Sequence, residues 1–149
     1  MSKLTQLSHE SSGVKILRAI AAIGFIAAGA NHFVKPGFYR QIVPPGFSAP
    51  AALVAISGVA EIAGGAGLLV RPLRRLAGFG LIALLIAVFP ANIYMALAPR
   101  RAPASNFPEW ALWLRLPIQA LIGAWVWYVA IDRSRAGFPE RPVRDSNAL

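Results

Sequence analysis

The chain has 149 residues, of which 56% are hydrophobic and 14% are charged, and its formal net charge is +9. Soluble domains carry about 25% charged residues, so this composition excludes an ordinary soluble domain and favours a one-domain membrane protein. The chain has no cysteine, which excludes disulfides, thiolate metal sites and CxxC redox chemistry on this chain. Its basic residues stand at the ends of apolar segments, as the charge rule for membrane proteins requires, so nucleic-acid binding is not expected.

Four long apolar segments predict an all-α fold, a four-helix transmembrane bundle with antiparallel up-down topology. A helix of twenty residues is about 30 Å long, which matches the hydrocarbon core of a bilayer. In chain order we expect a polar tail at 1–13, a membrane domain at 14–131 with spans at 14–34, 51–70, 76–98 and 110–131, and a basic tail at 132–149. The first span resembles a signal peptide in its basic start, but it runs on without a polar break, so we expect it to be retained.

The segment at 35–50 contains four prolines and two glycines, and this density predicts a loop rather than a helix. Its aromatic and aliphatic residues make it too apolar for a free linker. We therefore expect it to lie at the membrane interface and to cap the bundle. The residues expected to form that cap are Tyr39, Pro44 and Pro45.

The span at 51–70 is expected to be the central helix of the bundle. It carries one charge, Glu61, near its middle, and it is rich in small residues that let helices approach closely. An acid at that depth costs at least ~2.5 kcal/mol, so it should face protein or water and have a partner. In the next span, Pro90 is expected to kink the helix and to free a backbone carbonyl that needs another donor.

Counting Lys and Arg predicts the orientation. Ten of them fall on the side of the two termini and the middle connection, and five fall on the opposite side or within the fourth span. The positive-inside rule then places both termini in the cytoplasm, in a multi-pass protein of the bacterial inner membrane. Arg18 lies near this boundary and is expected to extend its charged end into water.

Six polar residues on four different spans fall at similar predicted depth: Asn31, His32, Glu61, Asn92, Arg115 and Gln119. Such groups are satisfied at least cost by facing one another, so they predict one polar cluster in the outer half of the bundle. Two interpretations stay open. In one, the cluster is a pocket for a small molecule. In the other, a buried Glu61–Arg115 pair only fixes which helices are neighbours.

The sequence indicates no metal site, because its two histidines have no ligand spacing. It has no phosphate-binding loop, nucleophile elbow or dinucleotide fingerprint. The chain is therefore not expected to be a stand-alone enzyme.

Several segments together resemble the DoxX family of small four-helix membrane proteins. They are AGANHFVKPGFYRQIVPP, SGVAEIAGGAGLLV, RPLRRLAGFGLIALLIAVFPANIYMAL and WLRLPIQALIGAWVW. The similarity extends over about residues 14–131. It implies a four-helix bundle, and it implies activities like those of the family, which includes a subunit associated with thiosulfate:quinone oxidoreduction and an animal branch that acts as a receptor chaperone. Because this chain has no cysteine, thiol exchange is not carried over.

The leading functional hypothesis is an accessory or scaffold subunit of a membrane redox or stress-response system, whose polar cluster binds a quinone or a small anion. Its expected partners are the lipid bilayer and a membrane or periplasmic oxidoreductase, with a homo-oligomer left open. One alternative is a membrane chaperone that recognises partner helices through its small-residue faces. Another is a small proton-coupled carrier, although the chain shows no inverted repeat.

Overall fold

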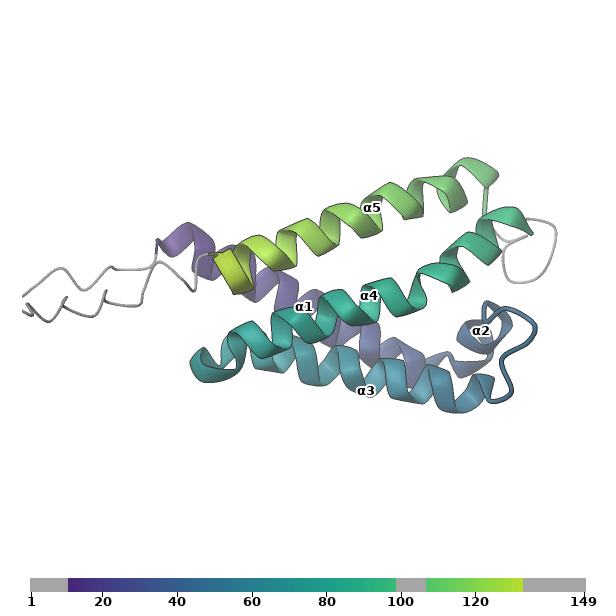
Figure 1. Cartoon of the computed structure of the whole chain (residues 1–149), viewed down its shortest axis with the longest axis horizontal. Coiled ribbons are helices and arrows are strands. Elements are labelled where there is room, and N and C mark those ends of the chain that lie inside the picture. The colour runs from purple at the N-terminus through teal and green to yellow at the C-terminus, as the bar shows by residue number, and fades with distance from the viewer. Residues whose placement is uncertain (1–10, 99–106, 133–149) are drawn as a thin grey trace, which may run out of the picture.

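The structure, a computed structural model, describes residues 11–98 and 107–132. Within these ranges the chain is all helical (Figure 1). The elements are α1 (Ser12–Val34), α2 (Pro36–Gln41), α3 (Pro50–Leu69), the 3-10 turn η1 (Arg71–Leu73), α4 (Arg74–Leu97), α5 (Glu109–Trp127) and the π-helical turn η3 (Tyr128–Asp132). Most of both predicted tails lies outside the described residues.

Four of these helices are long and apolar enough to cross a bilayer. They span 23, 20, 27 and 23 residues, if η1 is counted with α4 and η3 up to residue 131 with α5. The long helices pack on one another in chain order, α1 on α3, α3 on α4 and α4 on α5. This confirms the predicted up-down four-helix membrane bundle, with boundaries that differ from the predicted spans by one or two residues at most ends.

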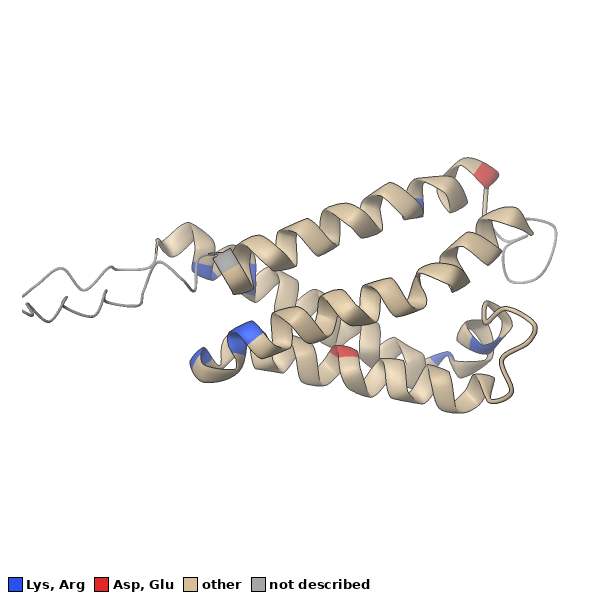
Figure 2. Cartoon of the chain, viewed as in Figure 1, with Lys and Arg blue, Asp and Glu red and all other residues tan. Residues whose placement is uncertain are grey.

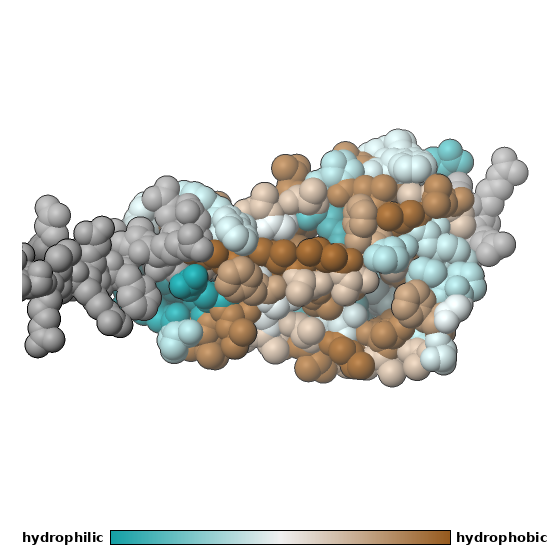
Figure 3. Space-filling model, viewed as in Figure 1, coloured by the Kyte–Doolittle hydropathy of each residue, from teal (hydrophilic) through white to brown (hydrophobic). Residues whose placement is uncertain are grey.

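The outer faces of the long helices are apolar. Large hydrophobic side chains are exposed on all four, among them Ile20, Ile23, Ile56, Val59, Leu76, Ile86, Trp110 and Leu121. Figure 3 shows such hydrophobic residues spread along the length of the bundle. Lipid chains solvate these faces as well as a protein core would, so the chain is a multi-pass membrane protein in contact with the bilayer.

Helices α1 and α3 form the most closely packed pair, and glycines make this possible. A Cβ atom on Gly29 would lie 2.5 Å from the backbone oxygen of Gly58, and one on Gly58 would lie 3.0 Å from the oxygen of Gly29. A Cβ on Gly65 would lie 2.8 Å from the oxygen of Ala22. Real Cβ atoms do not approach backbone so closely. The two helices therefore meet backbone to backbone, as small residues allow in membranes.

Two hydrophobic clusters hold the two ends of the bundle. The first joins α1, α3, α4, α5 and η3 near the chain's described ends, through Ala22, Phe25, Leu68, Leu81, Val126 and Ile131. The second lies at the opposite end, where Met95, Ala96 and Leu112 are buried and Phe38 and Ile42 pack against them. Figure 1 shows the long helices spreading apart toward this second end, where α2 lies. The segment after α1 therefore packs into the bundle.

Three local features add detail to the sequence-based expectation. The segment at 35–50 begins with a short helix, α2, because Pro36 stands at its first turn, where a missing N–H costs nothing. The helix α4 is continuous through Pro90, which lies inside it. The fourth span ends in a π-helical turn rather than as an α-helix.

Candidate functional site

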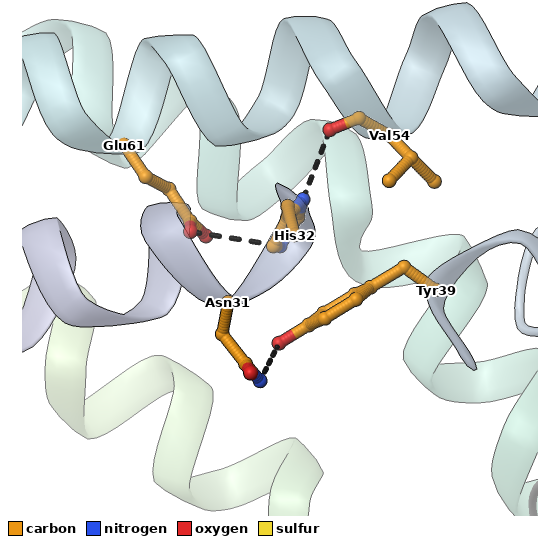
Figure 4. Close-up of polar contacts among 5 residues, drawn as sticks. All are labelled: Asn31, His32, Tyr39, Val54 and Glu61. Carbon is orange, nitrogen blue, oxygen red and sulfur yellow. Dashed lines mark hydrogen bonds and ion pairs between the residues drawn. The ribbon is translucent and has the colours of Figure 1, made fainter. Parts of the chain in front are cut away.

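The candidate site lies between α1 and α3, where two ionisable side chains meet inside the bundle (Figure 4). The Nε2 atom of His32 lies 3.6 Å from Oε2 of Glu61. His32 is 8% exposed, and the Glu61 side chain is 14% exposed. No hydrogen-bond donor among the described residues reaches Glu61 Oε2. The imidazole is therefore the polar partner of this carboxyl group within the structure.

The backbone fixes the tautomer of the histidine. Nδ1 of His32 lies 3.0 Å from the carbonyl oxygen of Val54. A carbonyl can only accept, so Nδ1 carries a hydrogen and donates it. The neutral ring then presents its Nε2 lone pair to Glu61. A carboxylate facing a lone pair would be repulsive, so the pair is stable with one further proton, carried either by Nε2 or by the carboxyl group.

Tyr39 of α2 covers this pair from the side of the loop. Its ring stacks on that of His32 with centroids 3.9 Å apart and planes inclined by 31°. Its hydroxyl accepts a hydrogen bond of 2.9 Å from Nδ2 of Asn31. Of the three residues predicted to cap the cluster, the structure brings Tyr39 onto it. Pro44 and Pro45 lie in the turn after α2, and no polar contact joins them to the pair.

The glycine contact sets the distance between the two ionisable groups. Gly29 precedes His32 by three residues, and Gly58 precedes Glu61 by three residues. Residues three apart share a helix face, so each glycine lies next to an ionisable side chain on the face that meets the other helix. A Cβ on Gly58 would lie 2.9 Å from His32 Cβ, and one on Gly29 would lie 3.0 Å from Glu61 Cβ. The close backbone contact therefore brings the histidine and the glutamate together.

The remaining predicted residues form a second polar group between α4 and α5. Asn92 Nδ2 donates to Gln119 Oε1 at 2.7 Å, and Gln119 Nε2 donates to the carbonyl oxygen of Leu85. Leu85 precedes Ile86, whose carbonyl loses its normal donor because Pro90 has no N–H. A side chain on the neighbouring helix thus donates to the carbonyl one residue before the one that the proline frees, and a donor for the Ile86 carbonyl itself stays a prediction.

Arg115 lies on α5 one turn before Gln119, and its partners are a methionine and an aromatic ring. Its Nη1 donates to Met95 Sδ at 3.5 Å, and its guanidinium lies 4.8 Å from the centre of the Phe107 ring. A cation over an aromatic face is attracted by the ring's quadrupole. This residue is half-buried.

The predicted Glu61–Arg115 pair is wrong. Glu61 contacts His32 instead, and the six predicted residues divide into two groups on different helix pairs. Two physical reasons account for this. Arg115 lies about 9 Å from the start of α5, whereas Glu61 lies about 16 Å from the start of α3, so their depths differ. In addition, α5 packs chiefly on α4, away from the face of α3 that carries Glu61.

The prediction for Arg18 is also wrong. Its charged end does not extend into water, because the residue is only 2% exposed. Its Nε donates a hydrogen bond of 2.9 Å to the carbonyl oxygen of Val129 in η3. The π-helical turn explains this acceptor, because its changed hydrogen-bond register redirects carbonyls that an α-helix would use internally.

Sequence reasoning missed the Val54 carbonyl and the glycine pair. A backbone carbonyl leaves no signal in side-chain chemistry. The glycines did leave one, the matching three-residue spacings Gly29 to His32 and Gly58 to Glu61. Among the described residues, no group of three or more His, Asp or Glu side chains is placed to hold a metal ion.

The fold and this site define a class: a multi-pass α-helical membrane protein with a histidine–glutamate pair buried between two of its spans. The particular family follows from comparison with family models. Residues 21–130 match the family described as a domain of unknown function, DUF8561. The match covers well over half of the chain, so the chain belongs to this family. No curated protein and no solved structure matched the chain.

Proposed function

We propose that this protein is an accessory subunit of a membrane redox or stress-response system, and that its His32–Glu61 pair binds the headgroup of a quinone. The observation that carries the proposal is the buried contact between His32 and Glu61, whose Nε2 and Oε2 atoms lie 3.6 Å apart. A quinone carbonyl accepts hydrogen bonds, and its reduction takes up two protons and two electrons. The pair would supply one of the two protons, water at the membrane surface would supply the other, and a partner oxidoreductase would supply both electrons.

The surroundings of the pair support a ligand of this kind. Tyr39 stacks on the imidazole, and an aromatic ring beside the pair is the kind of surface on which a flat quinone headgroup packs. Both groups lie inside the spans, where a lipid-soluble ligand arrives through the bilayer. A small anion is the alternative ligand, and it would bind the protonated form of the pair.

We also propose that the protein is related to the DoxX family. The family match does not itself assign DoxX. Support comes from the motifs that carry the resemblance, because the structure gives their polar residues contacts. The asparagine and histidine that end α1 contact Tyr39 and Glu61, and the asparagine after Pro90 contacts the glutamine of the fourth span.

The chaperone alternative loses part of its basis. It relied on small residues of α3 as a surface for partner helices, but Gly58 and Gly65 face α1, and Gly64 and Gly67 face Leu81 and Ala77. These positions are used inside the chain. The carrier alternative draws on the same His32–Glu61 pair and differs from the quinone proposal in its ligand.

We further propose that the protein lies in the inner membrane with both termini in the cytoplasm. The charge asymmetry of the sequence supports this orientation.

The test is binding of a short-tailed ubiquinone analogue to the full-length protein in lipid nanodiscs, by native mass spectrometry and by titration. Glu61→Gln keeps the shape of the side chain and removes its charge and its role as proton acceptor. We expect the dissociation constant to rise by about tenfold or more, equivalent to about 1.4 kcal/mol.

Glu109→Gln is the matched control, because it is the same chemical change at a residue that is exposed at the start of α5. Its affinity should stay at the wild-type value. No binding by the wild type would overturn the quinone proposal. An empty protein that retains a stoichiometric partner would favour the chaperone, and Glu61-dependent solute flux after reconstitution would favour the carrier.

A further inference from the structure

A hollow of about 330 Å³ lies at the end of the bundle where α1 begins and α3 ends. It is lined by Lys15, Arg18, Leu69, Arg71 and Arg74. These residues come from four elements, α1, α3, η1 and α4, so the fold brings them together. Its volume falls in the range of small-molecule sites, ~300–1,000 Å³.

Four of the five lining residues are cationic. Lys15 and Arg18 are three apart on α1 and share a face, while Arg71 and Arg74 begin η1 and α4. Figure 2 shows basic residues gathered at this end of the helices. Of the acidic residues whose side chains the structure describes, Glu61 lies mid-bundle and Glu109 begins α5 at the other end. The lining therefore concentrates positive charge.

Two of the guanidinium groups are held in place by backbone carbonyls. Arg18 Nε donates to Val129 O at 2.9 Å, and Arg74 Nε donates to Leu68 O at 3.3 Å. The second bond caps the last turn of α3, where a cation is also favoured by the helix dipole. Both charged groups are thereby oriented before any ligand arrives.

Helix capping does not account for the other two cations. Within the described residues no side-chain hydrogen bond or ion pair is made by Lys15 or Arg71, and both side chains are exposed. The Lys15 and Arg71 side chains therefore place two exposed positive charges at the rim of the hollow, where an anion would be attracted. Guanidinium and ammonium groups bind phosphate oxygens with charge-assisted hydrogen bonds.

We propose that this hollow binds a phosphate-bearing anion, and that the anion is the headgroup of an acidic membrane phospholipid. The apolar surroundings favour the lipid over a soluble phosphate. Leu69 lines the hollow and is 51% exposed, and Leu73 and Ile16 nearby are also exposed. A ligand with an anionic head and apolar tails covers both kinds of surface. Basic pockets between membrane helices bind phospholipid headgroups in this way. The proposal does not depend on the quinone site.

The experiment follows thermal unfolding of the delipidated full-length protein in neutral detergent, by its tryptophan fluorescence. Three titrants are compared: a phosphatidylglycerol, a phosphatidylcholine with the same acyl chains, and inorganic phosphate at matched ionic strength. We expect a saturable rise in melting temperature with phosphatidylglycerol and a smaller rise with phosphatidylcholine. Native mass spectrometry should retain one acidic lipid per chain.

Variants of the exposed lining residues keep the fold intact. Arg71→Gln and Lys15→Gln should each raise the half-saturating phosphatidylglycerol concentration about fivefold, the effect of one basic residue at an anionic lipid surface. Arg75→Gln is the matched control, since Arg75 is exposed on the same turn of helix but does not line the hollow. Its half-saturation should stay within about twofold of the wild type.

Each other result has a defined meaning. A saturable rise with inorganic phosphate that Arg71→Gln weakens would support the site but assign it to soluble phosphates. Equal effects of the two phospholipids would overturn the proposal, and so would an Arg75→Gln effect as large as that of Arg71→Gln. The absence of a saturable rise in melting temperature with phosphatidylglycerol would also overturn it.

Discussion

At the scale of single residues, the Val54 carbonyl determines the proton chemistry of His32. A carbonyl oxygen has two lone pairs, so the Val54 oxygen can accept one hydrogen bond within α3 and a second one from another donor. By accepting the Nδ1 hydrogen it leaves Nε2 as the ring atom that faces Glu61. The pair therefore gains or loses its further proton on the Glu61 side of the ring, where a ligand would exchange it.

Tyr39→Phe tests the contact that covers this pair. The substitution keeps the ring that stacks on His32 and removes the hydroxyl that accepts from Asn31. We expect a loss of about 0.5–1.5 kcal/mol in the free energy of unfolding, the usual net contribution of one hydrogen bond. The measurement is unfolding of the purified protein in mixed micelles by a denaturing detergent.

A double-mutant cycle with Asn31→Ala provides the control for Tyr39→Phe. If the hydrogen bond is real, the two substitutions together should cost less than the sum of their separate effects, because each removes the same interaction. Strict additivity would contradict the contact.

The sequence predicts which types of side chain form the candidate site, but not which of them contact each other. Hydropathy placed Glu61 and His32 within spans, and the high cost of a lone charge there required partners. The partner of Glu61 depends on how the helices are rotated about their axes, and residue type and depth do not determine that rotation. The charge of Arg115 makes it the expected partner of Glu61, whereas in the structure Glu61 of α3 contacts His32 of α1.

At the scale of elements, the glycine contact between α1 and α3 is the feature most sensitive to substitution. Gly29→Ala would place a methyl group 2.5 Å from the Gly58 oxygen, which forces the two backbones apart. We expect a loss of about 1–3 kcal/mol in the free energy of unfolding, typical of an overpacked interface. Because the same shift separates His32 from Glu61, ligand binding at the pair should weaken as well.

Gly24→Ala is the matched control for this prediction. Gly24 lies on the same helix, and a Cβ there meets nothing within 4 Å. Alanine is the better helix former by about 1 kcal/mol, so this variant should be as stable as the wild type or slightly more so. Equal destabilisation by the two substitutions would show that the backbone contact is not the cause. Detergent-induced unfolding measures both.

The long helices were predictable because their length and hydropathy are strong signals, and α2 was not. A six-residue helix with a proline in its first turn has the composition of a loop. It forms because Phe38 and Ile42 pack against the second hydrophobic cluster, a tertiary contact that local sequence does not encode. The neighbouring α5 also donates a hydrogen bond from Gln119 to the Leu85 carbonyl of α4, another tertiary contact that local sequence does not encode.

At the scale of the whole molecule, the described chain begins and ends at the same end of the bundle (Figure 1). The positive-inside rule assigns that end to the cytoplasm. Since the chain has no cysteine, single cysteines can be introduced at Ser11, before α1, and at Ser48, before α3. A membrane-impermeant maleimide added to intact bacterial spheroplasts should label Ser48→Cys and leave Ser11→Cys unlabelled until the membrane is opened. The reverse pattern would invert the topology.

The helix that carries Glu61 is also the shortest span. Its 20 residues extend about 30 Å, whereas the 27 residues from Arg71 to Leu97 extend about 40 Å. In a bilayer of average thickness α3 can stand nearly upright while its longer neighbour must tilt. A thicker, sterol-rich bilayer would leave α3 too short, and the lipid beside it would have to thin. Because α1 is joined to α3 at the glycine contact, hydrophobic mismatch bears directly on the His32–Glu61 pair, and the membrane's thickness becomes one of the variables that set its geometry.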